Sequence, residues 1–300
     1  MNKNNLLQTL YDKKIINAQK FVIDSLSYLT LTGSEAYGVS TNNSDKDFVG
    51  FCIPPKEVVF PHLAGYIKGF GTHPQNFENW SENHIVDKST GTEYDFSVYG
   101  IVKFFELCRQ NNPNMLDTLF THSSCISYSD KIGDMVRTHR HKFLHKGCYY
   151  KFKGYAYSQL SKIKNKVPDV KSKRYNDYVK YGMDVKYAYH VVRLANECEQ
   201  LLTEGTMDLR SCSRQLISIR NGEWTLDDLT SWFKQKEIQL DTLYQNSKAL
   251  PHKPDEEGLK QLLLNCLEEF YGSLDNTIII KDKYRVALLE IEEVLRSTLG

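Results

Sequence analysis

Two aspartates spaced two residues apart, Asp45 and Asp47, constrain the fold of this chain more than any other feature. Their segment has the composition of a β-strand, in which residues i and i+2 point to the same face of a sheet. Two carboxylates on one face repel each other, and burying them costs free energy unless a cation lies between them. The pair therefore predicts a strand that carries a metal site. A small turn, Gly33-Ser34, precedes it and is separated from Asp45 by ten residues.

Strand-like segments surround this pair. The run Leu29–Leu31 before the Gly-Ser turn is apolar and β-prone, and the run Asp45–Ile53 is stopped by a double proline. The segment Glu93–Tyr99 alternates polar and apolar residues, which is typical of a half-buried strand. An amphipathic helix is predicted directly after it, over residues 100–108.

The remaining segments are predicted to be helices or surface loops. Apolar residues recur with helical spacing over 5–26, which predicts one helix there. Residues 56–87 are rich in Gly, His, Pro and Asn and are expected to form a surface excursion. From Met115 onward the pattern is mainly helical, ending in an acidic and apolar helix over 283–299 that is expected to pack on the fold.

Strands early and helices late predict an α+β protein, with a mixed sheet flanked by helices and a mainly helical region behind it. We expect a catalytic domain over residues 1–122 and a helical, substrate-binding region over 123–300. The hydrophobic share of 41% and the charged share of 25% are those of an ordinary globular protein. A formal net charge of +1 favours no class of partner by itself.

Cysteine usage and hydropathy predict where the protein resides. The seven cysteines form no C-x-x-C pair, which is typical of reduced and mostly buried thiols in an intracellular protein. The first residues are too polar for a signal peptide, and no stretch reaches the roughly 20 apolar residues of a membrane span. We therefore expect a cytoplasmic protein with no membrane contact.

One segment is strongly basic despite the balanced total. Between Arg137 and Arg193 there are 15 lysines and arginines against 3 acids, a local charge of +12, interleaved with tyrosines and phenylalanines. Cations that bind phosphates and rings that stack on bases suit single-stranded nucleic acid. The alternative is a solvated helical face over buried tyrosines.

A two-metal site needs a third carboxylate beside Asp45 and Asp47, and both Glu93 and Asp95 are candidates. Asp95 stands between Tyr94 and Phe96, so it points away from the face that those rings bury. Three carboxylates suit Mg²⁺, or Mn²⁺ in its place, and two such ions can clamp the attacking and leaving oxygens of an in-line displacement. Without a metal, the aspartates would be an exposed acidic hairpin or a turn cap.

Other residues are candidates for binding phosphates. Ser34 stands at a turn that opens a helix, where its hydroxyl and backbone N–H can meet a phosphate, although it can equally be a plain turn residue. Lys186, His190 and Arg193 follow each other at i, i+4 and i+7, on one helical face that can meet a triphosphate or an RNA backbone. They can also form a surface stripe, with His190 packed at the edge of the core.

These residues together resemble a known superfamily. The pattern Gly-Ser-x-x-Tyr-Gly-x5-Ser-Asp-x-Asp-x-x-Gly, which begins at Gly33, is similar to the active-site motif of DNA polymerase β-like nucleotidyltransferases. In its longer form it resembles the branch associated with RNA repair in phages and bacteria. Further segments resemble that branch in order along residues 26–220: Lys103-Phe104-Phe105, Asn112 to Phe120, Gly154-Tyr155-Ala156 with Gln159, and Lys186 with His190, Arg193 and Leu194.

The resemblance implies transfer of a nucleoside monophosphate from a nucleoside triphosphate to a hydroxyl, with release of pyrophosphate. It implies that Asp45 and Asp47 bind both metals, that Asp95 completes the site, and that Gly33 and Ser34 hold the triphosphate. An RNA or tRNA 3′ end is the expected acceptor, in the cytoplasm of a bacterium or a phage-infected host.

Two alternatives to RNA end transfer remain. One keeps the chemistry and changes the acceptor to a protein hydroxyl, which is AMPylation, or to a small molecule. The other is a non-catalytic nucleotide- or RNA-binding partner, against which the intact acids argue.

Overall fold

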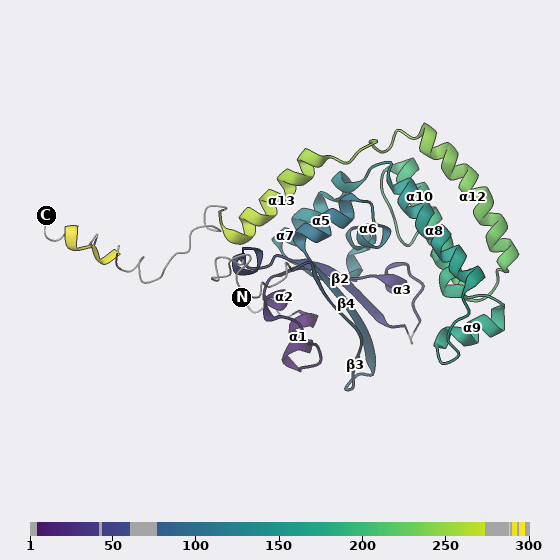
Figure 1. The fold of residues 1–300 in the computed structure, drawn as a ribbon, viewed down its shortest axis with the longest axis horizontal. Coiled ribbons are helices and arrows are strands. Elements are labelled where there is room, and N and C mark those ends of the chain that lie inside the picture. The colour runs from purple at the N-terminus through teal and green to yellow at the C-terminus, as the bar shows by residue number, and fades with distance from the viewer. Residues whose placement is uncertain are drawn as a thin grey trace, which may run out of the picture.

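The structure is a computed structural model that describes residues 5–41, 44–60, 77–273, 288, 290–292 and 294–297. Its centre is a five-stranded sheet in the order β3-β4-β2-β1-β5, with helices on both faces (Figure 1). Strands β2 and β4 are parallel, and the other neighbouring pairs are antiparallel. The strands are β1 (Leu26–Leu31), β2 (Lys46–Cys52), β3 (Asn79–Asp87), β4 (Thr92–Gly100) and β5 (Ile126–Ser129).

The two faces of the sheet bury separate apolar clusters because side chains alternate along each strand. On β4, Phe96 and Val98 are buried in a cluster with α1 (Leu6–Asp12) and α2 (Lys20–Asp24). The opposite face carries a larger cluster that runs from Tyr28 and Phe51 into the helical region. Asp95 and Ser97 point toward that second face, so the alternation expected for this strand is confirmed.

The helical region packs around two long antiparallel helices, α8 and α10, with α12 lying along their outer side (Figure 1). Burial of nearly the whole inner face of α10 explains why this region shares one core with the sheet. The helices beyond α2 are α3 (Gly33–Ala36), α4 (Lys56–Val59), α5 (Ile101–Arg109), α6 (Pro113–Phe120), α7 (Lys131–Thr138), α8 (Cys148–Asn165), α9 (Lys173–Tyr181), α10 (Val185–Glu204), α11 (Ser213–Arg220), α12 (Leu226–Asn246) and α13 (Glu256–Tyr271).

The single helix expected over residues 5–26 is wrong. The chain forms α1 and α2, separated by an irregular stretch, and β1 already begins at Leu26. Lys14 adopts a left-handed backbone conformation with φ of 56°, which ends the first helix. The apolar residues of this stretch are buried against the sheet all the same, so their spacing gave burial rather than continuous helix.

Two other expectations meet the sheet. The predicted surface excursion over 56–87 ends in the nine-residue strand β3, while residues 61–76 lie outside the described part. The expected domain boundary at residue 122 falls before β5, which pairs with β1 inside the same sheet. The helix expected over 283–299 lies largely outside the described residues.

The thiols and helices agree with the pattern expected from composition. All seven cysteines are free, and all except the half-buried Cys212 are buried. Among the described helices, none combines the length and the apolar character that crossing a membrane requires.

Candidate active site

The Gly-Ser turn lies directly against Asp47. The N–H of Thr32, at the end of β1, donates to the backbone oxygen of Asp47 at 2.8 Å. Gly33 follows with a φ of +60°, and a Cβ at this position would lie 2.2 Å from Asp47 Oδ2. Only glycine satisfies both the left-handed backbone and the close approach. The turn then opens the short helix α3, which includes Ser34.

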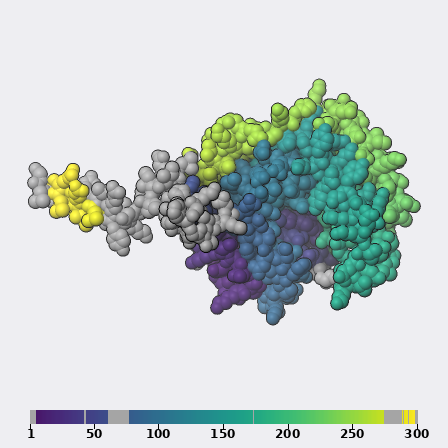
Figure 2. Space-filling view, viewed as in Figure 1, coloured from purple at the N-terminus to yellow at the C-terminus, as the bar shows by residue number. Residues whose placement is uncertain are grey.

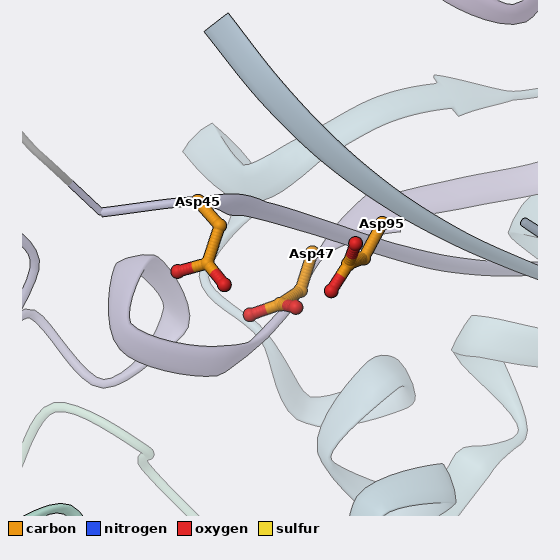
Figure 3. Close-up of side chains that lie close together, drawn as sticks. All are labelled: Asp45, Asp47 and Asp95. Atoms are coloured by element: carbon orange, nitrogen blue, oxygen red, sulfur yellow. The ribbon is translucent and has the colours of Figure 1, made fainter. Parts of the chain in front are cut away.

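Three carboxylates converge beside this turn. Asp45 immediately precedes β2, Asp47 lies within β2, and Asp95 lies on β4 (Figure 3). The parallel register pairs Asp47 with Asp95 across the two strands. One oxygen from each of the three acids lies within 4.8 Å of the others. The structure therefore brings together the pair and one of the two acids that the sequence offered as a third.

Crowding of these charges disturbs the acid at the centre. The pKa of Asp47 is raised from 3.8 to about 6, first by burial and then by the nearby Asp45, while Lys186 opposes the shift and Asp95 adds to it. A carboxylate that retains its proton this close to neutrality has too little positive charge around it. The donor set of three carboxylates with this unbalanced charge fits a divalent cation such as Mg²⁺ or Mn²⁺.

His84 holds Asp95 in position from the neighbouring strand. Its backbone N–H donates to Asp95 Oδ1 at 2.6 Å. This residue lies where the register of β3 shifts, and its φ of 58° is unusual for a residue other than glycine. The His84 ring also meets Glu93 Oε1 at 2.9 Å, and this contact raises the pKa of the imidazole. Glu93 thus lines the wall of the site, outside the acidic trio.

The acids open into a cleft of about 720 Å³ between the sheet and the helical region. In the space-filling view, the strands β3 and β4 and the teal α8–α9 region flank a recess (Figure 2). Gly33, Ser34, Lys186 and His190 all line this cleft, as the sequence predicted for a phosphate site. The sheet side of the cleft is acidic, and the helical side also contributes Arg174, Lys186 and Arg220.

His190 is a neutral side chain in this basic wall. Burial lowers its pKa well below 6.5, and the cations of Arg193 and Lys186 lower it further. The ring packs against Tyr189 with centroids 4.4 Å apart and meets the edge of Tyr37 at 6.3 Å. Its Nδ1 is buried and makes no hydrogen bond with any described residue. The imidazole can therefore donate or accept a hydrogen bond without adding charge.

Arg193 lies behind the cleft, although the helical spacing placed it on the same face as Lys186. Its side chain is only 1% exposed and forms ion pairs with Asp117 and with Glu197, the latter at 3.2 Å. The guanidinium also stacks on the ring of Tyr37 at 4.4 Å. The spacing predicted the face correctly, but α10 runs from the cleft into the core within these two turns.

Several cleft residues were not singled out as site residues from the sequence. His84, Arg174 and Arg220 come from segments without a motif, so no local signal identifies them. Asn114 and Tyr155 belong to segments quoted for the family resemblance, and they meet at the cleft with Asn114 Nδ2 3.5 Å from the Tyr155 hydroxyl. Their place in those segments was the available signal.

A mixed sheet with an acidic trio beside a Gly-Ser turn defines a polymerase β-like nucleotidyltransferase fold. Residues 7–265 match the family described as the RNA repair pathway DNA polymerase beta family, RlaP, and the chain belongs to this family. The resemblance expected from the motif is confirmed.

Individual relatives are more distant. An uncharacterized 38.9 kDa protein from the nrdC-mobD intergenic region of Enterobacteria phage T4 is 29% identical over 134 residues, which are 43% of this chain. The chain spans 36% of the length of that relative. The crystal structure of a nucleotidyltransferase-like protein from Exiguobacterium sibiricum 255-15 aligns with a TM-score of 0.28 and 10% identity, over 87% of this chain and 78% of that one.

Proposed function

We propose that this protein transfers a nucleoside monophosphate from a nucleoside triphosphate to the 3′ hydroxyl of an RNA, with tRNA as a candidate acceptor. The observation that carries the proposal is the acidic trio of Asp45, Asp47 and Asp95, whose oxygens lie within 4.8 Å of one another beside the Gly33 turn. The family description supports a role in RNA repair.

The acids would hold divalent metal, with Mg²⁺ as the first candidate. Bound there, the metal would neutralise the carboxylates, lower the pKa of the attacking hydroxyl and stabilise the charge that develops on the phosphates. The raised pKa of Asp47 supports this assignment, because a cation removes the repulsion that raises it.

The residues of the cleft have separate tasks in this proposal. Gly33 permits the backbone to approach the phosphates closely, and Ser34 offers its N–H and hydroxyl to the outer phosphates. Lys186 places a positive charge at the cleft on the side facing Asp47, where it can bind the triphosphate. The neutral ring of His190 supplies a hydrogen bond to the bound nucleotide.

The reaction forms one bond and breaks another at the α-phosphorus. The acceptor oxygen bonds to that phosphorus, the bond to the bridging oxygen breaks, and pyrophosphate leaves with the electron pair. The hydroxyl proton departs toward Asp95, whose Oδ1 is already held by the N–H of His84. Holding the carboxylate in this way leaves its other oxygen to face Asp47 (Figure 3).

The acceptor is tested by offering several acceptors at once. Purified protein is incubated with Mg²⁺ and each α-labelled nucleoside triphosphate in turn, in the presence of total tRNA and cell protein. We expect label in RNA, released by a 3′ exonuclease. Label confined to protein would overturn the RNA assignment while leaving the transfer chemistry intact. Absence of label in any acceptor, with every triphosphate, would overturn the transferase assignment.

A further inference from the structure

The structure divides the basic segment of residues 137–193 into two parts with different uses. In the first part the cations bind the protein itself. Arg137 donates to the Tyr28 hydroxyl at 3.1 Å, Lys142 pairs with Asp255 at 2.9 Å, and Lys153 pairs with Glu237 and Asp241 at 2.9 Å each. These side chains hold the helical region together and are not available to a ligand.

The second part is different. We call it the basic arm: residues 162–181, comprising the end of α8, the following loop and α9. Lys164, Lys166 and Lys171 are exposed, and no ion pair joins their side chains to any other described residue. Its acids are Asp169 and Asp177, so the arm keeps a net positive charge. An unpaired positive surface of this kind suits a phosphate backbone.

The basic arm is continuous with the cleft. Ser172, Arg174 and Asp177 line the cleft beside the acids and the phosphate turn. The arm is fixed to α10 because Arg174 forms an ion pair with Asp184 at 2.6 Å and lies 4.0 Å over the ring of Tyr187. In both views α9 stands across the recess from the sheet (Figures 1 and 2).

We propose that the single-stranded 3′ end of the acceptor RNA reaches the cleft along the basic arm, with its phosphates on Lys164, Lys166 and Lys171. The inference rests on the proposed function and assigns a surface to its acceptor. The 3′ hydroxyl must arrive at the acids, and this arm carries unpaired cations up to the rim of the cleft. The half-buried rings of Tyr175 and Tyr178 on α9 add surfaces on which bases can stack.

The test compares two triple variants that carry the same change of charge. One is Lys164→Gln, Lys166→Gln and Lys171→Gln. The control is Lys234→Gln, Lys248→Gln and Lys253→Gln, which alters exposed lysines in and after α12. The probe is a labelled RNA hairpin with a single-stranded 3′ tail of about 12 nucleotides, within the site sizes of single-strand binders. Affinity is measured by anisotropy over a range of salt, with full-length protein and without transfer.

We expect the arm variant to bind this RNA about tenfold more weakly and to lose about 2 from its salt slope, roughly 0.7 for each phosphate contact on a single strand. The control variant should stay within about twofold of the parent. Both should keep the parent's thermal shift with Mg²⁺ and a non-hydrolysable triphosphate. The RNA-binding measurement does not need catalysis, so its result is separate from failure of the proposed transfer.

Three results would overturn the inference. One is RNA affinity of the arm variant equal to that of the parent. Another is an equal loss in both variants, which would reduce the effect to total charge. The third is unchanged RNA affinity together with lost labelling of a protein acceptor, which would assign the arm to a protein partner.

Discussion

Asp47 is a residue whose fold and function oppose each other. The unfolded chain ionises it near pH 3.8, whereas in the fold its pKa is about 6. Between these values the folded state holds a proton that the unfolded state has lost, so stability falls as pH rises through this window. The penalty is complete above pH 6 and absent below pH 3.8. Such strain in the metal-free protein is typical of a binding site.

The change Asp47→Asn should therefore stabilise the metal-free protein at pH 7.5 by about 2 kcal/mol, because it removes a charge that the fold repels. The gain should shrink toward zero near pH 4. Urea unfolding in chelator at both pH values measures it. Added Mg²⁺ should stabilise the parent more than the variant. A variant less stable than the parent at pH 7.5 in chelator would contradict this electrostatic account.

Gly33 offers a second test at a single atom. Gly33→Ala places a methyl group where Asp47 Oδ2 now lies, at 2.2 Å, and should lower kcat/KM by about 100-fold by displacing the acid. Gly91→Ala is the matched control, since its φ is +71° and nothing lies within 4 Å of the added carbon. Both variants strain the backbone, but only the first should lose activity. Equal activity in the two would rule out the close approach as the reason for glycine.

At the scale of elements, alternation and helical spacing predicted β1, β2, β4 and α5 because each element buries one regular face. The same signals missed β3. Its exposed edge carries Glu82, Asn83 and His84, and its pairing depends on β4 rather than on its own apolar residues. They also joined α1 and α2 into one helix, since burial against a sheet gives a helical spacing without a continuous helix.

Helix α10 shows what spacing predicts and what it leaves open. Lys186, His190 and Arg193 were expected to act on the nucleotide together. The structure puts Lys186 and His190 in the cleft and Arg193 in the core. Whether a turn is buried depends on the packing of distant segments, here α3 with Tyr37 and α6 with Asp117. A sequence pattern within α10 does not contain that information.

These positions predict different effects for two substitutions on one helix. Arg193→Met should destabilise the protein by about 3–5 kcal/mol, because Asp117 and Glu197 would be left as buried charges without their partner. Lys186→Met should change stability by less than about 0.5 kcal/mol and weaken triphosphate binding. Chemical unfolding and nucleotide titration of both variants measure the contrast. A stable Arg193→Met protein with lost nucleotide binding would return Arg193 to the site.

At the scale of the whole molecule, charge is separated across the cleft. The acids stand on the sheet, and Arg174, Lys186 and Arg220 face them from the helical region, although the chain as a whole has a net charge of only +1. The sequence revealed the basic segment as a composition. It did not reveal which of its cations the fold uses internally, because those ion pairs join residues far apart in the chain.

The central claim is that the acidic trio performs the transfer. The most direct measurement is incorporation of α-labelled nucleotide into RNA by the parent and by the double variant Asp45→Asn, Asp47→Asn, with folding checked by circular dichroism and RNA affinity by anisotropy. The account predicts Mg²⁺-dependent incorporation by the parent, loss of at least about 1,000-fold in the variant, and unchanged RNA affinity. Incorporation by the double variant at the parent's rate would contradict it.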